Sequence, residues 1–91
     1  MDAVEFLLSL AHIDDRFERL GRLLRWLILA DGDFDGWWSF LILYDGVYGE
    51  LGSIFDNETR RRLEEIRERV AGAVAKAWLL YEARGEVEAD V

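Results

Sequence analysis

The chain has no cysteine, no proline, and a single histidine and methionine among its 91 residues. The absence of cysteine excludes disulfide bonds, thiolate metal sites and thiol nucleophiles. The absence of proline is compatible with a designed protein. Five glycines inside the helices expected below count against an idealised design, because each costs up to about 1 kcal/mol relative to alanine.

Positive charge and long apolar runs are also scarce. Eleven basic residues stand against 19 acidic ones, and the net charge of −8 argues against nucleic acids and anionic membranes as partners. The longest nearly uncharged apolar run, residues 37–44, is far short of the ~20 residues that span a bilayer. Asp2 and Glu5 stand where a secretory signal carries positive charge, so we expect a cytoplasmic protein.

Apolar residues recur at alternating steps of three and four in three stretches, which predicts one buried face on each of three α-helices. The rows are Phe6, Leu10, Ile13, Phe17, Leu20, Leu24 and Leu27; Trp37, Leu41, Tyr44, Tyr48, Leu51 and Phe55; and Leu63, Ile66, Val70, Ala73, Ala77 and Leu80. We expect helices over about 2–30, 36–55 and 57–84, the last stopped by Gly85 and followed by an acidic tail at 86–91. Because short connections force antiparallel neighbours, the sequence predicts an all-α, antiparallel three-helix bundle forming one domain over residues 1–91.

Two of these helices have alternatives. The first could break near His12, with Asp14–Asp15 capping a second helix, although the unbroken apolar row favours one helix. The second could instead be a β-hairpin through 38–44 and 47–55, because aromatic and β-branched residues favour strands. The three-four spacing continues across Asp45–Gly46, which favours the helix.

Residues 31–40 resemble the first ten positions of the EF-hand calcium loop. Asp31, Asp33 and Asp35 stand at positions one, three and five, where the family has oxygen ligands, and Gly36 stands at the glycine of position six. Calcium collects six to eight hard oxygen ligands around one point. The resemblance therefore implies a calcium site between two helices, with the three aspartates as ligands.

The loop departs from the EF-hand pattern at position twelve, where Ile42 replaces the bidentate glutamate. Without that ligand, calcium binding would be weak. The alternative is a plain helix connection in which Gly32 and Gly36 supply turns and Asp33 or Asp35 caps the next helix. We favour the connection and keep a weak calcium-binding or calcium-stabilised module as the alternative function.

All four tryptophans belong to segments that meet at one end of the expected bundle. Trp37 and Trp38 are adjacent, so a helix cannot bury both of them. Tryptophan and tyrosine are enriched in binding hot spots, although aromatic residues also fill the wide end of a bundle. We expect a partner-binding surface composed of Trp26, Trp37, Trp38, Trp78 and Tyr81.

The first expected helix is apolar nearly all round at both ends, over residues 6–8 and 27–29. One apolar stripe is enough for a three-helix core, so the extra faces imply a fourth element, either another copy of the chain or a partner. We therefore predict a non-enzymatic interaction or self-assembly protein: a small acidic inhibitor, an adaptor or a scaffold. Its partner would be itself or another protein.

Catalytic and cofactor signals are weak elsewhere. His12 is the single histidine, and a surface position is expected; a haem ligand is the alternative, without a second histidine or cysteine to support it. Paired carboxylates such as Asp14/Asp15 and Glu64/Glu65 lie among arginines, as on a solvated face. We predict no catalysis and no cofactor.

Overall fold

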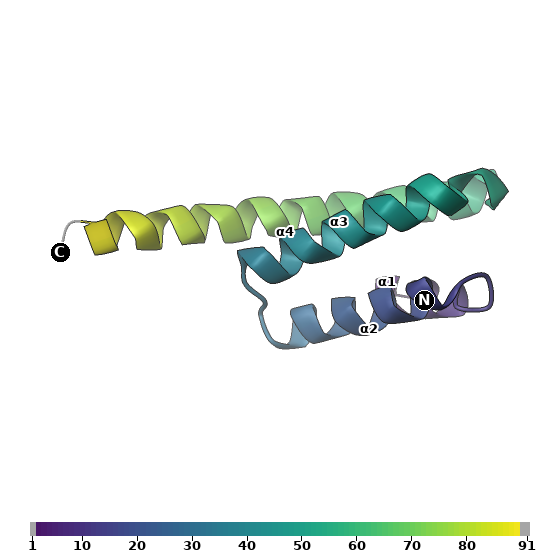
Figure 1. Ribbon diagram of the computed structural model, residues 1–91, viewed down its shortest axis with the longest axis horizontal. Helices are drawn as coiled ribbons and strands as arrows, with labels where there is room; N and C mark the ends of the chain where they lie inside the picture. Colours follow the sequence, from purple (N-terminus) through teal and green to yellow (C-terminus); the bar gives the residue numbers. More distant parts are fainter. Residues whose placement is uncertain (1, 90–91) are drawn as a thin grey trace.

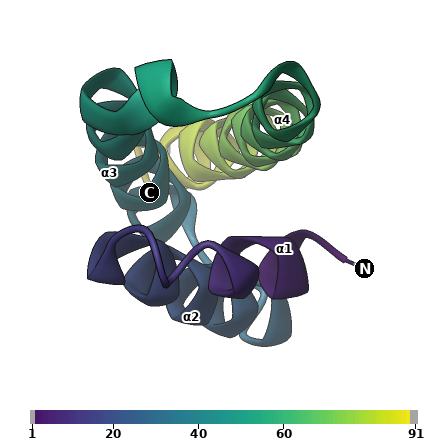
Figure 2. The ribbon, with the colours of Figure 1, turned by 90° about the vertical axis from the view of Figure 1, so that its right-hand side faces the viewer.

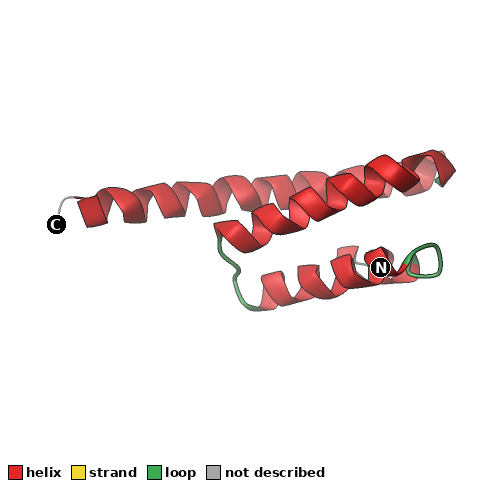
Figure 3. Cartoon of the chain, viewed as in Figure 1, coloured by secondary structure: helices red, strands yellow, loops and turns green. Residues whose placement is uncertain are grey.

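The structure, a computed structural model, describes residues 2–89 and the side chains of residues 2–84. Every regular element in that range is helical, with no strand (Figure 3). The elements are α1 (Ala3–Ser9), α2 (Asp15–Leu29), α3 (Phe34–Leu51), the short 3-10 helix η1 (Gly52–Ile54) and α4 (Asn57–Ala89). The all-α class is confirmed, and the prediction of three helices was wrong, because there are four α-helices in the described range.

The first expected helix divides at Leu10–Asp14. Asp14 adopts extended backbone angles and its side chain accepts a hydrogen bond from the backbone N–H of Arg16 at 2.8 Å, which caps α2. The chain between the helices keeps turn hydrogen bonds, such as Ile13 N–H to the Leu10 carbonyl oxygen at 2.9 Å. The apolar row continues through this turn because its spacing stays close to helical, so the row alone could not show the break.

The glycine at position 21 lets α1 fold back onto α2. A Cβ atom at Gly21 would lie 2.9 Å from Leu8 Cδ2, closer than carbon atoms normally approach. A side chain at position 21 would require Leu8 to shift, so the glycine allows α1 to pack closely against α2. The sequence implied that another copy of the chain or a partner would cover the extra apolar face of the first expected helix. Over two turns, α1 itself covers part of that face.

Acidic residues also begin the other helices. Asp33 caps α3 by accepting from Gly36 N–H at 3.0 Å, and Asp56 accepts from Thr59 N–H at 2.8 Å at the start of α4. The Thr59 hydrogen bond also lowers the pKa of Asp56. The last helix continues through Ala89, so the prediction that Gly85 stops it was wrong. The prediction of a separate acidic tail was also wrong over residues 86–89, because these residues belong to the helix. The final two residues of that tail lie outside the described range.

The four helices occupy four corners when the molecule is viewed end on (Figure 2). The two helices α2 and α3 lie on one side, and α1 and α4 lie on the other. The longest helix, α4, runs beside α3 and extends past the end where α3 begins (Figure 1). Because α1 has only seven residues, its corner is filled over a short part of the molecule's 52 Å length.

The core consists of apolar side chains from all four helices and the turn before α4. Phe17 and Phe55 meet edge to face with ring centroids 5.7 Å apart, which joins α2 to that turn. Most members belong to the predicted apolar rows. The buried residues are Val4, Phe6, Leu7, Leu10, Phe17, Leu20, Leu24, Leu27, Phe40, Leu41, Tyr44, Val47, Phe55, Leu63, Ile66, Val70 and Val74.

Candidate functional site

The loop between α2 and α3 is a tightly packed helix connection. The Trp37 indole N–H donates to the Gly32 carbonyl oxygen at 2.9 Å, and Asp31 has a φ of 50° in the left-handed region. A Cβ atom at Gly32 or Gly36 would lie 2.5 Å or 2.6 Å from Leu27 Cδ2. A side chain at either glycine would therefore require the buried Leu27 side chain to shift where the loop closes over the end of the core.

The predicted calcium ligands are not brought together. The Asp33 carboxylate already accepts a hydrogen bond from the backbone N–H of Gly36 in α3. Ile42, at EF-hand position twelve, is 56% exposed and offers no oxygen ligand. Within the described range there is no group of three or more His, Cys, Asp or Glu side chains that could hold a metal ion. The geometry gives no support to a site at Asp31, Asp33 and Asp35, and calcium binding stays a prediction.

Three of the five predicted partner-binding residues gather around a phenylalanine at the start of α3. The Phe34 ring lies 4.9 Å from the Trp78 ring, 6.0 Å from that of Trp38 and 6.1 Å from that of Tyr81, between centroids. Trp78 and Tyr81 also stack on each other at 5.7 Å. We call these four residues the aromatic cluster. The outer three are 41–58% exposed, so the cluster forms part of the surface.

The other two predicted residues lie apart from this cluster. Trp37 is half-buried against the core, with its indole N–H used in the loop. Trp26 is 60% exposed, and its ring approaches the position that a Cβ atom at Gly36 would take. The five tryptophan and tyrosine residues therefore do not form one site, although all of them lie at the same end of the molecule.

A groove between α2 and α3 was missed in the sequence. It has a volume of about 340 Å³ and is lined mainly by apolar atoms of Arg16, Arg19, Leu20, Leu23, Leu43 and Val47. Leu43 is 55% exposed although it lies in the middle of α3. The sequence feature that could have indicated this groove is that Leu23 and Leu43 are apolar but fall outside the predicted apolar rows.

A second apolar groove lies between α2 and α4. It has a volume of about 220 Å³, and Leu24, Ile28, Val70 and Ala73 contribute to its lining. Gly21, which contacts α1, and Ile28 are seven residues apart and share one face of α2. Ile28 is 56% exposed because α1 is too short to cover this part of that face.

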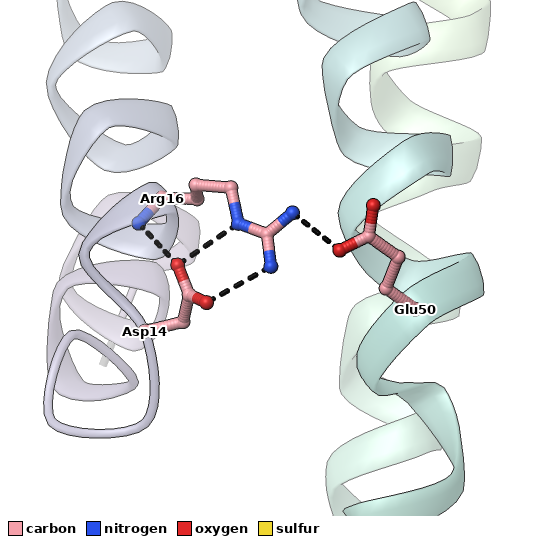
Figure 4. A network of polar contacts seen from close by, with 3 residues as sticks. All are labelled: Asp14, Arg16 and Glu50. Atoms are coloured by element: carbon pink, nitrogen blue, oxygen red, sulfur yellow. Dashed lines mark hydrogen bonds and ion pairs between the residues drawn. The ribbon is translucent and has the colours of Figure 1, made fainter.

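Ion pairs join two acidic side chains of α3, those of Asp45 and Glu50, to neighbouring helices. Arg16 binds Asp14 at 2.9 Å and reaches across to Glu50 at 2.6 Å (Figure 4). Hydrogen bonds from Arg16 hold the pKa of Asp14 at about 2 and raise the pKa of Arg16 itself. On the other flank, Arg67 of α4 binds Asp45 at 3.0 Å, which raises the pKa of Arg67. The outward surface of α3 between these pairs is left to uncharged residues.

No protein-family model matches the chain, and searches of curated proteins and of solved structures find no similar protein. Over the described residues, none of the helices has the length and apolar character needed to cross a membrane.

Proposed function

We propose that the protein is a non-catalytic helical interaction module that assembles with another copy of itself through apolar side chains left on its surface. The observation that carries this proposal is the concentration of large exposed apolar residues at one end. Eight of the eleven such residues in the described range lie where α2 ends, α3 begins and α4 passes them. They are Trp26, Ile28, Leu29, Trp38, Trp78, Leu79, Leu80 and Tyr81.

The size of this surface supports association. Its four aromatic side chains are 41–60% exposed, which corresponds to roughly 300–500 Å² of exposed aromatic area. The four aliphatic side chains, at 56–81% exposure, add to it. The largest apolar patch on a typical monomer is about 300–600 Å², and a stable interface buries about 800 Å² per partner. The exposed aromatic area alone thus reaches the range of the largest apolar patch on a typical monomer, and the four aliphatic side chains add to it.

Composition limits the classes of partner. A net charge of −8 disfavours nucleic acids and anionic membranes, while it suits a basic protein surface. A foreign basic protein is therefore the alternative partner, which would make the chain a small acidic inhibitor or an adaptor. No observation favours the calcium-binding alternative over either of these.

The mass of the protein in solution tests the proposal. We expect light scattering after size exclusion, at micromolar concentration, to give a mass above the 10.6 kDa of one chain. The mass should rise with concentration because association follows mass action. A mass of one chain at every concentration would contradict self-association and leave the foreign partner as the remaining form of the module.

A further inference from the structure

We infer that two copies of this chain pair through the end of α4, with the two α4 helices antiparallel and related by a two-fold axis near Leu79. This inference rests on the proposed function and names the interface within the exposed apolar end. Leu79 and Leu80 are 66% and 63% exposed, within the uncharged run 77–81 of the longest helix. Trp78 and Tyr81 already pack against Phe34 of their own chain, so the two leucines are left for a second copy.

The second half of α4 carries opposite charges on the two sides of these leucines. Residues 69–77 contain Arg69 and Lys76 and no acidic residue, whereas residues 82–88 contain three glutamates and one arginine. The neighbours of Lys76 three and four positions away on the helix are a glycine, an alanine and the two leucines. Neither Lys76 nor Glu82 forms an ion pair within the described range.

An antiparallel pair of these helices is therefore complementary in charge. Leu79 is the midpoint between Lys76 and Glu82, each of which lies three residues, about 4.5 Å, from it along the helix. A two-fold rotation about Leu79 places Lys76 of each copy at the level of Glu82 of the other. Parallel helices in register would instead set like charges beside each other. This order of charges argues for a second copy as the occupant, because one symmetric contact neutralises both ends.

Arg69 is available for the same contact. It borders a cavity that also has Asp2 and Glu65 in its lining, at the start of α1. Both acids have other partners, because Asp2 accepts from Glu5 N–H at 2.8 Å and Glu65 binds Arg61 at 2.9 Å. Arg69 forms no ion pair within the part of the chain that the structure describes.

The groove between α2 and α4 leaves room for the helix of the partner copy. The first helix, α1, begins at Ala3, which lines this groove together with Arg69. Leu80 lies eleven residues, or about three turns, after Arg69, so the open strip continues along one face of α4. Arg69 lies ten residues before Leu79, and α4 continues ten residues past it to Ala89, about 15 Å in each direction. The end of one α4 thus covers the strip that the short α1 of the other copy leaves open.

The walls of this strip suit a closely packed helix. A Cβ atom at Gly72 would meet nothing within 4 Å, so the outer face of α4 is low beside the leucines. Across the groove, Ile28 of α2 is 56% exposed, and Arg25 lies one turn before it without an ion pair in the described range. Contact along about 30 Å of α4 and against this wall buries on the order of 1,000 Å² in total, which a specific interface needs.

The first test compares the association of the wild-type chain with that of Leu79→Glu and Leu43→Glu, by light scattering and analytical ultracentrifugation. Both leucines are exposed in mid-helix, so both variants should keep the helical circular dichroism of the wild type. We expect Leu79→Glu to weaken pairing at least about tenfold, because it sets two carboxylates against each other at the axis. Leu43→Glu, on α3 and outside this interface, is the control and should change pairing less than about twofold.

Charge exchange tests the antiparallel geometry. Lys76→Glu and Glu82→Lys should each weaken pairing several-fold, because each sets like charges at the same level of the two helices. The double variant restores opposite charges and should recover wild-type affinity. A double variant that pairs no more tightly than the single variants would overturn the antiparallel arrangement.

Crosslinking locates the contact directly, because Lys76 is the single lysine of the chain. A carbodiimide joins a lysine to a carboxylate without a spacer, and mixing nitrogen-15-labelled with unlabelled chains identifies crosslinks between copies. We expect mass spectrometry to find Lys76 of one copy joined to Glu82 of the other. Crosslinks between copies that join Lys76 only to carboxylates of α2 or α3 would overturn the pairing of the α4 helices.

The outcomes also separate this inference from the proposed function. If the wild type associates and Leu79→Glu associates equally well, self-association stands and the end of α4 is not its interface. A wild type that stays monomeric overturns both, and a foreign helix would become the occupant to seek.

Discussion

The Tyr44 hydroxyl donates a hydrogen bond to the backbone carbonyl oxygen of Leu63, at 2.5 Å, within the interface between α3 and α4. Both side chains are buried, at 2% and 0% exposure. A buried phenol needs such a partner, and the carbonyl of a helix can accept a second hydrogen bond. The bond therefore fixes the register of the two longest helices at one point.

Loss of this bond should be measurable. Tyr44→Phe keeps the ring and removes the donor, so we expect a loss of about 1 kcal/mol in the free energy of unfolding. Urea titration at one fixed protein concentration measures it. Tyr81→Phe is the matched control, because Tyr81 is 58% exposed, and its effect should stay within about 0.5 kcal/mol. Equal effects in the two variants would contradict a role for the Leu63 carbonyl.

Alkaline pH should unfold the protein through the same side chain. Burial raises the pKa of Tyr44 above its ordinary value of 10.0. Above pH 10 the unfolded chain releases this proton while the folded chain keeps it, so stability falls as pH rises, by up to about 1.4 kcal/mol per pH unit. The contribution is fully present below pH 10. Tyr44→Phe should show a shallower alkaline loss than the wild type, and identical slopes would show that Tyr44 is not responsible.

Two glycines should respond in opposite ways to the same substitution. Gly49→Ala places its Cβ atom in open space, so we expect a gain of up to about 1 kcal/mol from helix propensity. Gly21→Ala places its Cβ atom 2.9 Å from Leu8 Cδ2. The cost of this close contact should exceed the gain in helix propensity, so we expect a net loss of about 1 kcal/mol in the free energy of unfolding. Thermal unfolding at matched concentration compares them. A stabilised Gly21→Ala variant would mean that α1 does not pack closely on α2.

The loop aspartates should act on stability without calcium. Asp33→Ala removes the cap of α3 and should cost about 1 kcal/mol. Asp35→Asn is the control, because it changes a neighbouring carboxylate and leaves the cap. Millimolar calcium should leave the unfolding midpoint and the tryptophan fluorescence of the wild type unchanged. A calcium-dependent rise that Asp33→Ala abolishes would restore the EF-hand interpretation.

Much of the core was predictable because burial follows helical spacing. Phe17, Leu24 and Leu27 of the first row, and Leu63 of the third, are among the least exposed residues. The division of the first helix was not predictable from that row, since a tight turn at Leu10–Ile13 preserves the spacing. The capping residue Asp14 was visible in the sequence, but no local rule weighs one cap against a continuous apolar face.

The candidate surfaces were predictable in part. The adjacency of Trp37 and Trp38 required one of them to face outward, and Trp38 is the exposed one, at 47%. The central role of Phe34 was not predictable, because the sequence places it in the expected loop outside every apolar row, and its contact with α4 depends on the tertiary arrangement. The groove between α2 and α3 likewise depends on how two helices lie together, which single-helix periodicity does not report.

The arrangement of the helices divides the molecule into two contacting pairs, α1 with α2 and α3 with α4. Their covalent link is the short connection before Phe34, while contacts such as Phe17–Phe55 and Arg16–Glu50 hold them together through side chains. A chain cut between Asp31 and Gly32 would keep each of these contacts available. We therefore expect the two halves of a chain cut at this point to stay together through the side-chain contacts between them.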